Sequence, residues 1–417
     1  MAARKPYFTV VPRRLFLCLI IVVVYCAAGI GVLFVYSTAD SWPGRLAQLP
    51  RRRAPAIATA GDAAPVIPPT SGRRDGQEGA NAGPDAAALA AEAMAEADKE
   101  RKKREDSAKK TKSFLEKEPF MENPPGKPSV CPTTLSKLGR YSSWFRNRYR
   151  PNAKVFLNQE DASNYTHLKK YRLPFGVGEM NNSFFSSIVN HPNFTNPPLP
   201  TVRSESGCVR CAVVGCGGIL NGSGAGSAID SHDYVFRLNR AIGVGRHGQD
   251  VGHKTTFYMF FPESEHIPDV TDKDAIFIYA MFKMYDATYA RTMLSDVDPP
   301  IAKSVKGDRK IRKPRVRPSK LKFVHPDFMR YVFATYLEGV AVRPTTGALL
   351  VVLSLHLCDE VNIFGFGYDT RFTLHYYDRE FVKHTDASTA LHDVDNERVL
   401  WRKLHDEGAI RLFKRDA

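Results

Sequence analysis

The chain has 417 residues, and a composition of 43% hydrophobic and 25% charged residues excludes a wholly disordered or fibrous protein. One long apolar run near the N-terminus excludes a transporter with many membrane spans. The net charge is +15, and the stretch 303–322 holds ten Lys and Arg residues against one acid, Asp308. Because this stretch has no aromatic residue on which a base could stack, we predict a solvated basic loop and no nucleic-acid partner. A patch that faces phosphate or another anion is the alternative.

A membrane anchor is predicted at residues 15–36, where twenty-two residues carry no charge. A helix needs about 20 such residues to cross the hydrocarbon core of a bilayer. The four basic residues within positions 1–14 place that tail in the cytoplasm and everything after the span in a lumen. A cleaved signal peptide, the alternative, has an apolar region of only about 7–15 residues. We therefore expect a single-pass type II membrane protein.

Residues 37–125 lack the apolar pattern of a folded core. Their first part is rich in Ala, Pro, Gly and Arg, and the part from 86 to 117 is rich in Ala, Glu and Lys without an apolar stripe. We expect a stem that is disordered or forms a solvated helix. Aromatic residues return near Cys131, so we assign residues 126–417 to one large α/β domain.

Five cysteines follow the predicted span, and an odd number in an oxidising lumen leaves at least one outside an internal disulfide. Cys208 and Cys211 have the spacing of half a zinc site, but no second pair of cysteines or histidines follows, so zinc is the weaker interpretation. Sequons for N-glycosylation agree with a lumenal location. They begin at Asn164, Asn181, Asn193 and Asn221.

A β-rich run at 210–214 ends in a glycine turn at 215–218, and a helix-like segment and a second strand-like run follow. This order predicts the start of a parallel βαβ unit. Glycines let a backbone approach a phosphate, and the N-terminus of the next helix offers free N–H groups. A dinucleotide oxidoreductase would place Asp230 or Asp233 on the ribose, but Leu220 stands where its third glycine is required.

A second polar turn at 344–347 precedes an apolar helix predicted over 348–358 and a buried strand within 361–367. Thr345 and Thr346 are suited to cap this helix with their hydroxyls. The helix N-terminus is a further anion site. Two such turns in one domain indicate a nucleotide ligand held between strand ends.

Titratable groups gather near the C-terminus, where four histidines lie between residues 375 and 405. Histidine changes its charge near lumenal pH, so one of these side chains is the natural candidate for a general base. They are His375, His384, His392 and His405.

Four segments together resemble the animal sialyltransferases. The long motif corresponds to residues 211–258, the short motif to 343–367, the third motif to HYYD at 375–378, and the very short motif to His392 with Glu397. They occur in the order expected of that family. The flanking segments 325–331 and 401–415 are most similar to the α-N-acetylgalactosaminide α-2,6-sialyltransferases, and the predicted anchor and stem fit them as well.

The resemblance implies a Rossmann-like α/β catalytic domain with a mostly parallel central sheet, in the glycosyltransferase-A variant of sialyltransferases. It also implies transfer of sialic acid from CMP-sialic acid to the 6-hydroxyl of GalNAc on O-linked glycoproteins, with inversion of the anomeric centre. The enzyme would be held at the Golgi membrane by its anchor and would use no metal and no other cofactor.

Carried over residue by residue, the resemblance implies that His392 is the general base, with Glu397 as its supporting residue. His375, next to Tyr376, is expected to contact the donor phosphate. The expected donor-binding residues are Gly215, Cys216, Gly217, Asn239, Thr345, Thr346 and Gly347. The expected disulfides are Cys211–Cys358 and Cys131–Cys208, which would leave Cys216 free.

Cys216 departs from the family pattern, whose turn carries an asparagine that holds the donor. A thiol is a poor substitute for an amide, so an inactive lumenal glycan-binding homologue is one alternative. A metal-dependent glycosyltransferase is another, because the DVD sequences at 393–395 and 296–298 are similar to a DxD metal motif. The first turn of a helix explains 393–395 without metal. CMP-sialic acid also favours a metal-free reaction, since its leaving group carries one phosphate and one base is sufficient.

Overall fold

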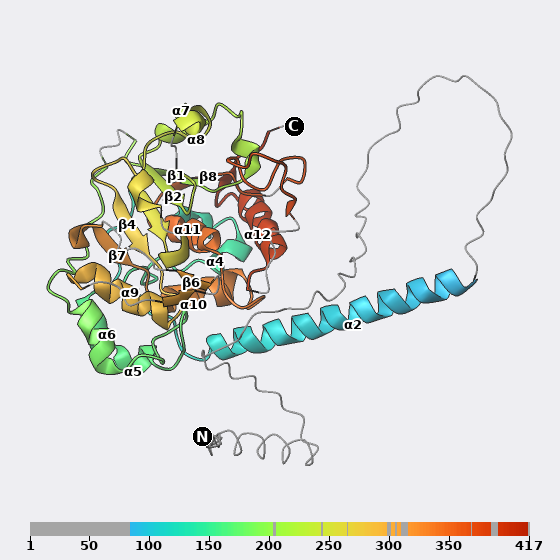
Figure 1. The fold of residues 1–417 in the computed structure, drawn as a ribbon, viewed down its shortest axis with the longest axis horizontal. Helices are drawn as coiled ribbons and strands as arrows, with labels where there is room; N and C mark the ends of the chain where they lie inside the picture. The colour runs from blue at the N-terminus through green and yellow to red at the C-terminus, as the bar shows by residue number, and fades with distance from the viewer. Residues whose placement is uncertain are drawn as a thin grey trace, which may run out of the picture. The chain divides into compact units, whose positions relative to one another are not determined.

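A computed structural model describes residues 84–202, 206–242, 245–264, 266–297, 302–304, 307–309, 316–367, 369–384 and 391–415. The tail and the membrane span predicted within residues 1–36 lie outside these ranges. Among the described residues, no helix is both long and apolar enough to cross a bilayer. Figure 1 gives the arrangement of the helices and strands.

Seven parallel strands form the central sheet, in the order β7-β4-β3-β2-β1-β8-β9. Both faces of a parallel sheet are covered, which is why its strands are apolar and rich in β-branched and aromatic residues. The α/β class and the parallel sheet expected from the sequence are confirmed. The strands are β1 (Arg210–Val214), β2 (Tyr234–Leu238), β3 (Phe257–Phe260), β4 (Ile276–Tyr279), β7 (Leu321–Phe323), β8 (Glu360–Phe364) and β9 (Arg411–Leu412), with a separate hairpin of β5 (Ala302–Ser304) and β6 (Gly307–Arg309).

Helices cover both faces of the sheet because alternate residues of each strand point to opposite sides. On one face, Val213 and Phe236 pack with the apolar helix α11 (Thr346–Leu355), which lies against the middle of the sheet in Figure 1. On the other face, Val214 packs with α7 (Gly226–Asp230) and α8 (Gly248–Val251). The other helices of this domain among the described residues are α3 (Leu135–Leu138), α4 (Ser143–Arg146), α5 (Tyr165–Leu168), α6 (Asn182–Val189), α9 (Met284–Leu294), α10 (Pro326–Tyr331) and α12 (Val394–Asp406). Short 3₁₀ turns are η1 (Gln159–Ala162), η2 (Gly218–Leu220), η3 (Gly245–His247), η4 (Pro262–Ser264), η5 (Ile267–Asp269) and η6 (Pro318–Lys320), and η7 (Val332–Tyr336) is a π-helical turn.

The segment predicted to be a stem contains one long helix, α2 (Pro84–Leu115). Most of its described side chains are exposed, and Arg–Glu pairs four residues apart support it. Its C-terminal end is different, because the buried Arg330 donates hydrogen bonds to the carbonyl oxygens of Leu115 and Glu118. Packing against the α/β domain therefore begins on the N-terminal side of residue 126.

The glycine turn after β1 does not lead directly into a helix, contrary to the sequence-based expectation. A single 3₁₀ turn, η2, follows, and then a loop in which Gly222 and Gly224 have φ values of 69° and 64°. Helix α7 begins only at Gly226 and has five residues. Glycine is a weak helix former and readily adopts positive φ, so this segment forms a loop instead.

The basic stretch 303–322 is not wholly a solvated loop. Its last residue, Lys322, lies in β7, is buried, and donates a hydrogen bond of 2.8 Å to Oδ1 of Asn196. Burial lowers the pKa of Lys322 to about 8. Residues 305–306 and 310–315 lie outside the described part of the chain.

Both expected disulfides are present, and Cys216 is the free cysteine of the described residues. Cys211 in β1 is joined to Cys358, which lies between α11 and β8, across 147 residues of sequence. Closing a loop of that length contributes on the order of 5 kcal/mol in the chain-entropy treatment. This disulfide ties together the three elements whose ends form the candidate site.

Candidate active site

A cavity of about 380 Å³ lies at the carboxyl ends of β1, β2 and β8. Strand β2 flanks β1 on one side and β8 flanks it on the other, and ligands of open α/β sheets bind where the order reverses in this way. The glycine turn after β1 forms one wall. A Cβ atom on Gly217 would lie 2.6 Å from the carbonyl oxygen of Gly365, so a larger residue does not fit and the backbone itself lines the cavity.

Asn239 lies directly after β2 and lines this cavity. Its φ of 49° is left-handed, and its backbone carbonyl accepts a 2.8 Å hydrogen bond from the Tyr258 hydroxyl. The side-chain Oδ1 is buried and has no hydrogen-bond partner among the described residues. An unpaired buried polar atom and a strained backbone both cost free energy, and such costs are typical of binding sites. The amide is therefore placed to bind a ligand in the cavity.

The N-terminus of α11 forms the opposite wall, with Thr345, Thr346 and Gly347. The Thr345 hydroxyl caps the helix, as expected, by accepting a 3.0 Å hydrogen bond from the Ala348 N–H. Glu397 of α12 accepts hydrogen bonds from the Thr345 N–H at 2.9 Å and from its hydroxyl at 2.6 Å. Burial raises the pKa of Glu397 to about 7, while the two bonds from Thr345 oppose that change. Glu397 thus fixes the position of the turn that contains Thr345.

His392 precedes α12 and also lines the cavity. Its Nδ1 lies 3.1 Å from the carbonyl oxygen of Arg343. A carbonyl oxygen can only accept, so Nδ1 carries the proton and Nε2 of the neutral ring keeps its lone pair. Burial lowers the pKa of His392, and the nearby Arg343 charge acts in the same direction. A neutral imidazole with an unprotonated Nε2 is the form that a general base requires.

His375 lines the cavity after a loop that follows β8. Its backbone N–H donates a 2.8 Å hydrogen bond to Oδ2 of Asp378, and its Nδ1 lies 3.3 Å from Oδ1 of the same carboxylate. The imidazole stacks on the Tyr377 ring at a centroid distance of 5.0 Å. Asp378 and Tyr377 therefore hold the ring so that Nε2 is the nitrogen left for a ligand.

Tyr376 contacts the glycine turn at Cys216. Tyr376 is buried, and its hydroxyl donates hydrogen bonds to the carbonyl oxygens of Arg240 and Ile242, which anchors the loop after β2. Its backbone N–H bonds to the Cys216 carbonyl at 2.9 Å. Burial raises the pKa of the Cys216 thiol to about 11, so this side chain is neutral and offers a ligand only weak hydrogen bonds.

The acidic residues of the 393–395 sequence are engaged on their own helix. Asp393 caps α12 by accepting a 2.9 Å hydrogen bond from the Asn396 N–H, and Asp395 pairs with Arg398 at 3.1 Å. First-turn acids of this kind are stabilised by the helix dipole. Of the second DVD sequence, Asp296 is exposed and Asp298 lies outside the described residues.

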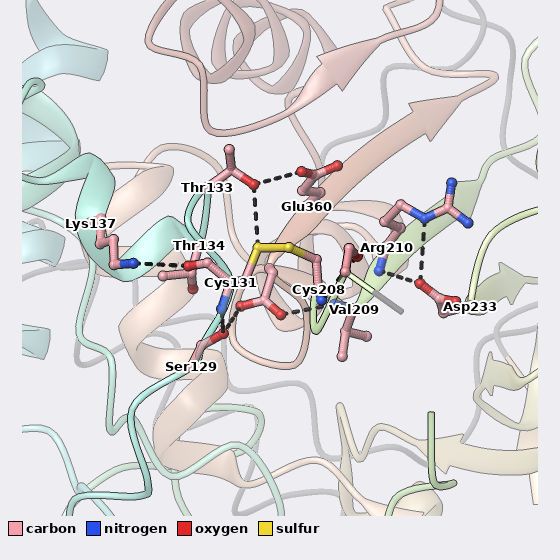
Figure 2. The surroundings of a disulfide bond; sticks show 12 residues. Ser129, Cys131, Thr133, Thr134, Lys137, Cys208, Val209, Arg210, Asp233 and Glu360 are labelled. Atoms are coloured by element: carbon pink, nitrogen blue, oxygen red, sulfur yellow. Dashed lines mark hydrogen bonds and ion pairs between the residues drawn. A yellow bond between two sulfur atoms is a disulfide. The ribbon is translucent and has the colours of Figure 1, made fainter. Parts of the chain in front are cut away.

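Figure 2 shows the surroundings of the Cys131–Cys208 disulfide, where Glu360 lies close to both sulfur atoms. The disulfide excludes thiolate ligands here, and Glu360 accepts a 2.6 Å hydrogen bond from the Thr133 hydroxyl. Because Cys208 and Cys211 belong to different disulfides, the zinc interpretation of their spacing is wrong. The group is a structural link between the N-terminal segment of the domain and β1.

Three sequons expected to carry glycans lie on α5, α6 and the loop that follows α6. Asn181 and Asn193 are exposed, whereas Asn164 is half-buried and its Nδ2 lies 3.3 Å from Oδ1 of Asp161. Nδ2 of Asn193 donates a 2.8 Å hydrogen bond to the Leu294 carbonyl. Asn181 is thus the sequon whose environment is most open to modification.

Sequence reasoning missed the aromatic lining of the cavity and the residue that orients His375. Phe261 and Phe366 line the cavity from positions just after β3 and β8, and Tyr377 lines it beside His375. The position directly after a strand end is the signal that could have identified both phenylalanines. The carboxylate of Asp378, three residues after His375, could have been identified as its partner from the short separation alone.

A sequence model described as glycosyltransferase family 29 (sialyltransferase) matches residues 156–409, which include every element of the cavity. The chain belongs to this family. The matched range contains all four motifs on which the resemblance was based. Helix α2 precedes it.

Three relatives illustrate the similarity. α-N-Acetylgalactosaminide α-2,6-sialyltransferase 1 of Gallus gallus is 33% identical over 323 residues, covering 69% of this chain and 56% of that protein. CMP-N-acetylneuraminate-β-galactosamide-α-2,3-sialyltransferase 1 of Gallus gallus is 33% identical over 298 residues, covering 70% of this chain and 83% of that protein. A crystal structure of a mammalian sialyltransferase in complex with Gal-β-1-3GalNAc-ortho-nitrophenol is similar with a TM-score of 0.53 and 29% sequence identity. The match covers 69% of this chain and 100% of that one. The chain thus spans little more than half of the first of these relatives.

Proposed function

We propose that this protein transfers sialic acid from CMP-sialic acid to the 6-hydroxyl of GalNAc on O-linked glycoproteins. Family membership supports the transfer and the donor. The α-2,6 linkage to GalNAc is supported by the relative from Gallus gallus that matches the chain over 323 residues. An α-2,3-sialyltransferase is equally identical over a shorter stretch, so the linkage depends on experiment.

The observation that carries the proposal is the orientation of His392. Its Nδ1–H is held by a backbone carbonyl, so Nε2 is free to accept a proton at the edge of a cavity whose other walls suit a nucleotide sugar. Asn239 offers an unpaired amide and the N-terminus of α11 offers N–H groups to an anion.

The proposed reaction is a single displacement. The acceptor hydroxyl loses its proton to Nε2 of His392 while its oxygen bonds to the anomeric carbon of sialic acid. The bond from that carbon to the phosphate oxygen breaks, and CMP leaves with the electron pair. Attack from the side opposite the phosphate inverts the anomeric centre. His375, held at Nδ1 by Asp378, would contact the phosphate through Nε2 and stabilise the charge that develops there.

We also propose that no metal takes part, and that the chain is a Golgi type II membrane protein with its anchor at 15–36 and glycans at Asn164, Asn181 and Asn193.

One competing function is favoured by a specific residue. Cys216 replaces the amide expected in the glycine turn, which would suit a lumenal glycan-binding homologue without catalytic activity.

Transfer assays with the purified full-length protein in detergent test these proposals. We expect α-2,6-sialylated GalNAc-peptide as the product, formed at the same rate in excess EDTA. Loss of activity in EDTA that Mn²⁺ restores would support the metal-dependent class instead. Glycopeptide binding without transfer or donor hydrolysis would support the inactive homologue. Galactosyl-GalNAc-peptide as the preferred acceptor would show that galactose must be attached first.

A further inference from the structure

A second hollow, of about 710 Å³, lies between helix α2 and the loop that leads to α11. Arg104, Ser107 and Thr111 of α2 form one side, and His392 and Asp393 lie on the other. His392 also lines the cavity at the strand ends. His392 therefore borders two hollows, and only one of them is built from the predicted donor turns.

The α2 side of this hollow is fixed to the domain. Ala108 packs so closely on the loop that a Cβ atom added to Gly339 would lie 2.8 Å from the Ala108 carbonyl oxygen. Further along, the Tyr171 hydroxyl donates a 3.2 Å hydrogen bond to the Phe114 carbonyl, and Arg330 holds the end of the helix. Residues 104, 107, 108 and 111 follow the three- and four-residue spacing of one helix face. This face of α2 is therefore held toward His392.

We propose that α2 forms one wall of the acceptor subsite and that the second hollow receives the acceptor glycan. This inference rests on the proposed function. A general base must contact the acceptor hydroxyl, and the donor fills the side of His392 that faces the strand ends. The acceptor must then reach Nε2 without displacing the donor, and the second hollow opens beside the same residue.

The chemistry of the lining suits a sugar. It combines two hydroxyl groups, of Ser107 and Thr111, with the carboxylates of Asp393 and Asp395 and the guanidinium of Arg104. Sugar hydroxyls can both donate to carboxylates and accept from a guanidinium. Because α2 lies before the range that the family model matches, this wall comes from a part of the chain outside the shared catalytic region.

The test compares Ser107→Trp with Ser113→Trp in the full-length protein. Both serines are exposed on α2, but Ser113 lies on the opposite side of the helix from the hollow. An indole at position 107 would fill the hollow. We expect the acceptor KM to rise about tenfold or more while the donor KM stays within about twofold, the pattern of an obstructed acceptor site. Ser113→Trp should leave both constants unchanged.

Binding of a GalNAc-glycopeptide, measured by calorimetry without donor, gives a readout that does not depend on transfer. If the wild type binds but does not transfer, and Ser107→Trp no longer binds, the proposed function fails while the subsite stands. Equal affinity and equal acceptor KM in wild type and Ser107→Trp would overturn the subsite. A wild-type protein that shows no measurable binding of the glycopeptide would also overturn the subsite.

Should Ser107→Trp unfold, Arg104→Ala replaces it, with Lys102→Ala as the control on the other side of the helix. Arg104 is exposed and pairs only with Glu100 among the described residues, so its removal spares the core. Weaker glycopeptide binding in Arg104→Ala alone supports the subsite, and equal binding in both variants contradicts it.

Discussion

The two hollows that border His392 are built in different ways. The donor-side cavity is made of backbone turns at the ends of neighbouring strands, and the Cys211–Cys358 disulfide ties those strands together. The α2-side hollow is made of side chains on a helix that Arg330 holds through backbone carbonyls. The first depends on motifs that are local in sequence, whereas the second depends on several contacts between α2 and residues far away in sequence, of which Arg330 lies more than two hundred positions from Leu115. The difference predicts which changes disable each side.

Loss of the disulfide should have the largest effect. We expect Cys358→Ser to misfold and to be retained before the Golgi, because opening the loop costs on the order of 5 kcal/mol and the affected elements carry the cavity. Secretion and donor binding of a soluble form test this. Normal secretion of Cys358→Ser would show that the disulfide is dispensable. Cys216→Ser, which breaks no disulfide, is the matched control for secretion.

Loss of the Arg330 side chain should have the next largest effect. Arg330→Met removes the guanidinium that pairs with the buried Asp327 and frees the carbonyls at the end of α2, so we expect a loss of about 3–5 kcal/mol in the free energy of unfolding. Cleavage of α2 by a protease should also become faster than in wild type.

The control for Arg330→Met is Arg101→Met, whose side chain forms only exposed pairs on α2. Its unfolding midpoint should match that of wild type. Protease resistance of α2 that survives Arg330→Met would show that other contacts hold the helix.

Glu397, which holds the turn at the donor-side cavity, should make the free energy of unfolding depend on pH. Its pKa of about 7 lies above the 4.5 of an unperturbed glutamate, so the folded protein binds more protons between these values and loses stability as the pH rises from about 4.5 to about 7. Glu397→Gln cannot ionise. We expect its stability relative to wild type to increase by about 3 kcal/mol between pH 5 and pH 8, measured by urea unfolding. A difference that does not change with pH would contradict the buried, protonated glutamate.

Asn239 should give the smallest effect. Asn239→Ala removes the amide that lines the cavity, and one hydrogen bond corresponds to about a tenfold rise in donor KM. Acceptor KM should not change. An equal rise in both constants would indicate a distorted loop instead of a lost donor contact. Asn182→Ala on the exposed side of α6 serves as the control.

Local sequence patterns were sufficient to predict the strands near 210–214, 234–238 and 360–364 and the apolar helix that begins at Thr346. Each is dominated by one signal, a short apolar run or a capped apolar helix. The two turns could be placed together because strand ends of a parallel sheet meet at one edge, whereas His392 was assigned through the family resemblance. The disulfides followed from the family resemblance.

Other features depend on contacts that no local pattern encodes. The docking of α2 relies on Arg330, which lies 215 residues from Leu115 in sequence. The helix expected after the glycine turn is reduced to the five residues of α7 because Gly222 and Gly224 adopt positive φ in the loop before it, which only the folded loop determines. The unpaired amide of Asn239 likewise appears only when the strand ends are brought together.

The central claim is that Nε2 of His392 accepts the proton of the acceptor hydroxyl. The most direct test is the pH dependence of transfer for wild type and His392→Ala, with CMP-sialic acid affinity measured by calorimetry. We expect His392→Ala to lose turnover by about 10²–10⁴-fold with nearly unchanged donor affinity. We expect the wild-type rate to rise with pH around a midpoint below 6.5, because burial lowers the pKa of His392. Near-normal turnover in His392→Ala, with the loss found instead in His375→Ala or His384→Ala, would contradict the assignment.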